Sequence, residues 1–177
     1  MVRHYLVISA LGEDCPGIVK KLSKIIVDSN CNIEESRMTV LGGEFALILL
    51  TSGSEEDVAR IQDLLAARGK ELKLTVITKP TEPKKAQQKM VPCNVNVVSI
   101  DHPGIVHEVS EFFSHRNINI AELNTESYSA AHTGSPMFSI TMAISVPAEL
   151  HISKLREEFV DFCDSLNMDA TLNTEKP

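Results

Sequence analysis

Apolar residues in the first 78 positions recur with the period of a strand in some segments and of a helix in others. Leu6, Ile8 and Ala10 lie two apart, as on one face of a strand, whereas from Ile18 onward apolar residues recur every three or four positions. The pattern predicts a strand at 5–11, a helix at 16–29, strands at 32–41 and 44–51, a helix that begins at 54–57, and a strand around 72–76.

The second half of the chain repeats the first. One motif occurs twice, 87 positions apart, as Asp14-Cys15-Pro16-Gly17-Ile18-Val19 and as Asp101-His102-Pro103-Gly104-Ile105-Val106. The same offset relates Asn32-Ile33 to Asn119-Ile120. Phe45 and Phe138 lie 93 positions apart, so the second copy has six extra residues, which we place within 126–136. The second copy is predicted to form a strand at 93–100, a helix at 103–116, strands at 118–128 and 137–146, a helix at 148–164, and a strand at 167–173.

The order of elements in each copy, strand–helix–strand–strand–helix–strand, predicts an α+β fold. It is typical of ferredoxin-like modules, in which a four-stranded antiparallel sheet carries both helices on one face. We predict a first module at 1–78, a linker at 79–90 and a second module at 91–177. The linker contains two prolines and four lysines, a composition typical of a solvated connection.

The strand at 44–51 is apolar on both faces, although helices cover only one face of such a sheet. Ala46, Ile48 and Leu50 are therefore expected on the open side, whereas the matching positions of the second copy are mostly serine and threonine. We predict a protein-contact surface at these three residues and self-association to a homodimer or a larger assembly. Scattered surface apolar residues would fit the same pattern.

Charge differs between the parts of the chain. Residues 1–78 carry a net charge of −2, residues 79–90 carry +3, and residues 91–177 carry −8. Direct DNA binding requires a basic face, so this balance argues against it. No apolar run is long enough for a membrane span, and the chain does not open with a secretion signal. Four cysteines without a C-x-x-C pair favour a cytoplasmic location.

The repeated motif places an aspartate and a glycine where a strand passes into a helix. A helix N-terminus has unpaired N–H groups and attracts carboxylates, while an aspartate beside it can accept a hydrogen bond from an ammonium group. The pair suits an α-amino acid. The candidate ligand-binding residues are Asp14, Cys15, Pro16, Gly17, Ile18, Val19, Asn32 and Ile33, and in the second copy Asp101, His102, Pro103, Gly104, Ile105, Val106, Asn119 and Ile120. Alternatively, Asp14 and Asp101 cap their own helices.

Other chemistry finds little support in the sequence. The six histidines form no metal-ligand pair, and neither a phosphate-binding loop nor a nucleophile motif is present. Cys15 and His102 occupy matching places in the two motifs, and a passive role is favoured for both. We therefore expect neither enzyme activity nor a cofactor or metal.

The order of elements together with the Asp-x-Pro-Gly turn resembles the ACT domain. The whole chain is similar to the glycine cleavage system transcriptional repressor family. The segments that carry this resemblance are Leu6–Gly12, Asp14–Val19, Cys31–Arg37, Leu41–Phe45 and Asn119–Leu123.

The resemblance implies two ACT modules without a DNA-binding domain, with amino acids bound where the turn faces a neighbouring copy. It also implies a regulator that restrains a DNA-bound activator by protein contact, with glycine as the ligand. The alternative is a tandem-ACT amino-acid sensor that regulates an enzyme or another partner.

Overall fold

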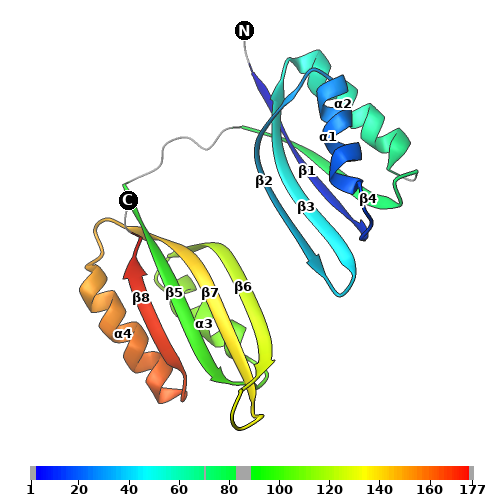
Figure 1. Ribbon diagram of the computed structural model, residues 1–177. Coiled ribbons are helices and arrows are strands. Elements are labelled where there is room, and N and C mark those ends of the chain that lie inside the picture. The colour runs from blue at the N-terminus through cyan, green and yellow to red at the C-terminus, as the bar shows by residue number, and fades with distance from the viewer. Residues whose placement is uncertain (1–2, 70, 83–88, 176–177) are drawn as a thin grey trace. The chain divides into compact units, whose positions relative to one another are not determined.

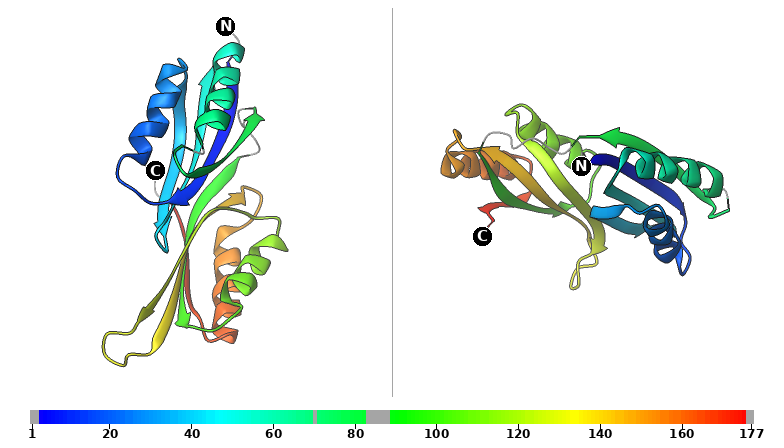
Figure 2. Two further views of the ribbon diagram at one scale, coloured as in Figure 1. Left: turned by 90° about the vertical axis from the view of Figure 1, so that its right-hand side faces the viewer. Right: turned by 90° about the horizontal axis from the view of Figure 1, so that it is seen from above.

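The computed structural model describes residues 3–69, 71–82 and 89–175. The chain divides into two compact units, Met1–Lys85 and Ala86–Pro177. In each unit two helices lie on one face of a four-stranded sheet (Figures 1 and 2). The predicted α+β fold, with two βαββαβ modules, is confirmed.

The first module has its strands in the order β2-β3-β1-β4, and all neighbours are antiparallel. Its elements are β1 (His4–Glu13), α1 (Ile18–Asp28), β2 (Asn32–Leu41), β3 (Glu44–Gly53), α2 (Glu55–Arg68) and β4 (Leu74–Thr81). Helix α1 buries Ile18, Leu22, Ile25 and Ile26, which lie on one helical face. Each such side chain contributes about 1.5–3 kcal/mol when fully buried, so this face holds the helix on the sheet.

The second module has the equivalent order β6-β7-β5-β8, again antiparallel throughout. Its elements are β5 (Met90–Ile100), α3 (Ile105–Ser114), β6 (Asn119–Ser129), β7 (Pro136–Pro147), α4 (Ile152–Ser165) and β8 (Asp169–Thr174). The core here is aromatic, because the rings of Phe113 and Phe159 pack with centroids 4.9 Å apart. Gly42 and Gly43 alone connect β2 to β3, whereas the β6–β7 connection contains the six residues 130–135, four more. The other two extra residues extend the strands as the pair Ser129 and Pro136, so all six lie where predicted.

Several predicted boundaries need correction. Helices α1 and α3 begin at Ile18 and Ile105, each two residues later than predicted, because Gly17 and Gly104 have φ values of 92° and 107° that no helix accommodates. Helix α4 begins at Ile152 and not at residue 148, because residues 148–151 form a turn after β7. Strand β4 starts and ends later than predicted, and its last residues, 79–81, belong to the first sheet and not to the linker. Residues 83–88 of the predicted linker lie outside the described residues.

Strand β2 is the sheet edge that the helices leave uncovered. All ten of its residues are exposed. Met38 and Val40 pair with the buried residues Leu47 and Phe45, so they point to the helix side of the sheet, yet they are 55% and 43% exposed. An open edge with apolar side chains is a surface on which another chain can pack.

Candidate functional site

The first Asp-x-Pro-Gly turn is anchored to the hairpin between the two strands that follow it. The backbone N–H of Asp14 donates to the carbonyl of Gly43 at 3.0 Å. Residues 14–17 are exposed, and helix α1 then begins with the buried Ile18. A side chain at Gly17 would meet open space, so its positive φ, not crowding, is what favours glycine there. The turn therefore presents the helix N-terminus to solvent.

The second turn has the same anchor and one further bond. The N–H of Asp101 donates to the carbonyl of Pro136 at 3.0 Å, and Pro136 matches Gly43 in the repeat. The hydroxyl of Ser127 donates to the Asp101 carboxylate at 3.0 Å. Gly104 has a φ of 107° and is followed by the buried Ile105. The two turns are thus equivalent in backbone geometry.

Neither aspartate caps its own helix. The N-cap positions of α1 and α3 are Gly17 and Gly104, and among the described residues no side chain caps either helix. Helix α2 provides the contrast, because the Ser54 hydroxyl accepts a bond from the Asp57 N–H at 3.2 Å. The interpretation of Asp14 and Asp101 as caps is therefore wrong. The aspartate of each turn therefore precedes an exposed helix start, and its carboxylate accepts no hydrogen bond from the N–H groups of that helix.

An open cavity of about 740 Å³ lies at the second turn. It is lined by Asp101, His102, Pro103, Gly104, Ile105, Val106, His107, Pro136 and Phe138. The six predicted residues of the second motif are thus brought together around one concave surface. The volume lies within the range of small-molecule sites, about 300–1,000 Å³.

The asparagine pairs do not lie at these turns. Asn32 pairs with Ser52 in the sheet, whereas Asp14 bonds to Gly43, nine residues away along β3. At about 3.3 Å per residue these positions are about 30 Å apart. Helix α1 runs back along the sheet before β2 begins, so the start of β2 lies at the opposite end of the module. One module alone cannot place Asp14 and Asn32, with Ile33, on the same ligand.

The same separation holds in the second module. Asn119 pairs with Ser145 and Ile120 with Ile144, far along β7 from Pro136. Asn119 and Ile120 line a separate open cavity of about 460 Å³, together with Ser110 and Ser114 of α3.

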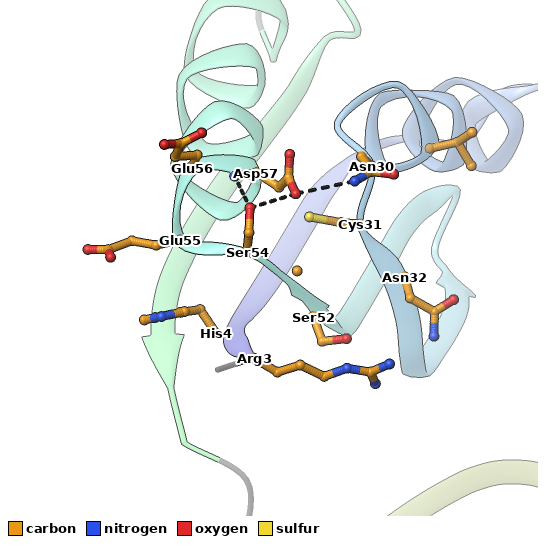
Figure 3. A pocket seen from close by; sticks show the side chains of 12 residues that line it. Arg3, His4, Asn30, Cys31, Asn32, Ser52, Ser54, Glu55, Glu56 and Asp57 are labelled. Atoms are coloured by element: carbon orange, nitrogen blue, oxygen red, sulfur yellow. Dashed lines mark hydrogen bonds between the residues drawn. The ribbon is translucent and has the colours of Figure 1, made fainter. Parts of the chain in front are cut away.

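Asn32 lines a polar cavity of about 920 Å³ in the first module (Figure 3). Its lining residues are Arg3, His4, Val27, Asn30, Cys31, Asn32, Ser52, Gly53, Ser54, Glu55, Glu56 and Asp57. One side is fixed by Asp57, which accepts bonds from Ser54 at 2.6 Å and from Asn30 at 3.4 Å. Sequence reasoning missed this cavity, because its residues come from three separate segments, 3–4, 27–32 and 52–57, and only the helix start at 54–57 carried a local signal.

Glu34 organises the side chains beside this cavity. Its carboxylate accepts bonds from Ser52, from Asn32 at 3.2 Å and from Arg3 at 3.4 Å. The bond from Ser52, followed by that from Asn32, lowers the pKa of the Glu34 carboxyl below its ordinary value. Burial raises the pKa of the neighbouring Cys31 thiol, so this cysteine stays protonated near neutral pH.

The predicted protein-contact residues lie on the open face of the first sheet. Ile48 is 50% exposed, and Ala46 and Leu50 are half-buried, whereas the alternate residues of β3 pack beneath the helices. Their placement agrees with the alternation in the sequence, and the contact itself stays a prediction. Within residues 3–69, 71–82 and 89–175, no group of three His, Cys, Asp or Glu side chains is arranged to hold a metal ion. Over the same ranges, no helix is long and apolar enough to cross a membrane.

Comparison with known proteins identifies relatives along the whole chain. The ACT domain model matches residues 4–79. The glycine cleavage system transcriptional repressor of Escherichia coli strain K12 is 32% identical over 171 residues, which cover 97% of this chain and 90% of that protein. A crystal structure provisionally described as such a repressor matches with a TM-score of 0.78 at 30% identity, with both chains covered in full. The structure of an unknown protein from Galdieria sulphuraria matches with a TM-score of 0.84 at 26% identity, over 99% of this chain and 100% of that one.

Proposed function

This chain belongs to the glycine cleavage system transcriptional repressor family, and from that premise we propose that it is an amino-acid-responsive regulator that contacts a DNA-bound activator. It is a regulatory protein built of two ACT modules and acts without binding DNA itself. The net charge of −8 on residues 91–177 supports this, because such a surface repels a duplex. We place its action in the cytoplasm.

The proposal rests on the start of α1 and of α3, where an exposed aspartate lies beside a helix N-terminus that no side chain of the described residues caps. The ligand carboxylate faces the N–H groups of Gly17, Ile18 and Val19, and the ligand ammonium faces Asp14. The first N–H groups of a helix have no partner within the helix, and the bond from the Ile18 N–H to Cys15 is long at 3.4 Å. The second module offers the equivalent site from Asp101 to Val106. The charge-assisted bond to an aspartate selects a ligand with an ammonium group.

The asparagines complete the site from a neighbouring copy. Asp14 and Asn32 lie at opposite ends of a module, so one ligand meets both only where the first modules of two chains pack side by side in opposite directions. The exposed edge supports such packing, because Val19 and Val27 of α1 are 50% and 71% exposed beside the uncovered apolar residues of β2. Asn32, or Asn119 in the second module, then donates or accepts a hydrogen bond at the ligand.

Glycine is the first ligand to test, because the printed name of the Escherichia coli relative connects that protein to glycine cleavage. Calorimetric titration of the full chain with glycine, alanine, serine and leucine should give binding for a small amino acid and none for leucine. Heat from none of the four at millimolar concentration, about the weakest affinity that is readily measured, contradicts the proposal.

A second measurement tests whether the protein acts on a DNA-bound activator. In a gel shift at moderate salt, the protein alone should leave operator DNA free, and it should further retard a complex of the DNA with its activator. A salt-sensitive shift by the protein alone contradicts the proposed mode of action. Amino-acid binding without any effect on the activator complex would favour a sensor that regulates an enzyme or another partner.

A further inference from the structure

A groove of about 550 Å³ lies between the two helices of the second module. It is lined by Glu108, Glu111, Phe112, His115 and Arg116 from α3 and the residues after it, and by Glu158, Asp161 and Phe162 from α4. The rings of Phe112 and Phe162 form an aromatic pair with centroids 5.1 Å apart. The lining residues include four carboxylates and one guanidinium group. This groove is distinct from the turn and from the cavity beside it.

The chain's own Arg116 indicates which chemistry the groove accepts. Its guanidinium lies 3.7 Å from the centroid of the Phe112 ring. It also donates to the Glu158 carboxylate at 3.1 Å and to the Phe112 carbonyl at 3.0 Å. A planar cation thus gains both a ring face and a carboxylate here, a combination that suits arginine better than lysine.

Carboxylate oxygens of the groove that Arg116 does not contact can bind a second cation. One oxygen of Glu108 is buried and has no hydrogen-bond partner among the described residues. An unpaired buried acceptor is unfavourable, and a donor that reaches it removes that penalty. Glu111 lies 3.7 Å from His115 and Glu158 lies 3.8 Å from Lys154, and these side chains are at least two-fifths exposed. Such exposed pairs are weak and exchange readily with another partner.

The first module has the opposite charge at the same positions. Lys21 and Lys24 of α1 match Glu108 and Glu111 at the offset of 87, and Ile25 and Ser29 match Phe112 and Arg116. The fold therefore does not require the acidic aromatic groove, since the first module has the same architecture without it.

We propose that this groove docks an arginine-bearing segment of the protein partner. The inference rests on the proposed function, which supplies a protein partner, and complementary charge guides and orients the docking of a cationic segment in this groove. An arginine of the partner stacks at the half-buried Phe162 ring and bonds to Glu108, Glu111 and Asp161.

The first test uses a fluorescently labelled hexa-arginine peptide and measures anisotropy with the full chain. The double variant Glu111→Gln/Asp161→Gln should weaken binding about tenfold, roughly 1.4 kcal/mol. The control Glu149→Gln/Asp169→Gln changes the net charge equally but lies outside the groove, and it should change affinity less than about twofold.

Phe162→Leu should weaken the binding of the arginine peptide more than the binding of a hexa-lysine peptide. Equal losses in the two double variants mean attraction by net charge alone and overturn the proposal.

The second test uses the activator complex in the gel shift. If the wild type retards the complex and the groove variant does not, the proposal is supported. Retardation by the groove variant equal to that by the wild type overturns it and leaves the proposed function standing. If the wild type has no effect on the complex, the proposed function fails, and the groove is then no activator-docking site. Inhibition by free arginine at concentrations that also displace the peptide would identify a small-molecule site and overturn the docking role.

Discussion

The open sheet faces of the two modules differ although their buried faces are alike. Val7, Ile48 and Ile77 make the first open face apolar, and Ile77 is 66% exposed. On the second, Asn96, Thr141 and Thr171 lie in one row across three strands. Packing constrains only the face beneath the helices, so the open faces were free to diverge. Two copies of one fold can therefore carry two different surfaces.

The buried faces are alike in being apolar, but Phe113 stands where the first module has Ile26. Both side chains are nearly fully buried, but Phe113 contacts the rings of Phe112 and Phe159. Phe113→Ala should cost about 3–5 kcal/mol of unfolding free energy and Ile26→Ala about 2–5 kcal/mol. Because the two cores are separate clusters, hydrogen exchange should increase only in the module that carries the change. Equal exchange in both modules would contradict independent cores.

The open faces are compared directly by Ile48→Lys and Thr141→Lys, which occupy matching positions. If the first face buries Ile48 against another copy, a lysine there removes about 1.5–3 kcal/mol of apolar burial and introduces an unpaired charge. Light scattering should then show dissociation of the homodimer for Ile48→Lys and none for Thr141→Lys. Dissociation by neither variant would mean that the apolar face does not hold an assembly.

The two turns are compared by Asp14→Ala and Asp101→Ala. Each change removes a charge-assisted bond worth about 1.5–3 kcal/mol, so titration should show an affinity loss of about 10- to 150-fold at the altered site. Because neither aspartate caps a helix, the melting temperature of Asp14→Ala should remain close to that of the wild type, and Asp101→Ala should lose only the contribution of the exposed bond from Ser127. A lower melting temperature with unchanged affinity would instead indicate a structural role.

Periodicity predicted most of this fold, because the buried faces of strands and helices impose it directly. It failed where conformation depends on single residues or distant contacts. Gly17 delays the start of α1, which leaves Asp14 too far from the helix to cap it. The separation of Asp14 from Asn32 follows from the return path of α1, which local patterns do not indicate. The polar cavity around Asn32 was missed because strand pairing assembles it from remote segments.

Glu34 provides the smallest of these comparisons, because the matching residue of the second module is Ala121. Both residues lie at a bulge in an edge strand, but only Glu34 bonds to Ser52, Asn32 and Arg3. Those bonds lower its pKa in the folded state. Its stabilising contribution is therefore present above the ordinary carboxyl pKa and is lost as pH falls through the lowered value.

Glu34→Gln should slightly reduce the stability of the first module at neutral pH and flatten its decline below about pH 4.5. The second module should respond to acid as before, and residue-resolved hydrogen exchange between pH 3 and pH 7 measures both. An unchanged acid response of the first module in Glu34→Gln would mean that the solvent-exposed network adds nothing to folding.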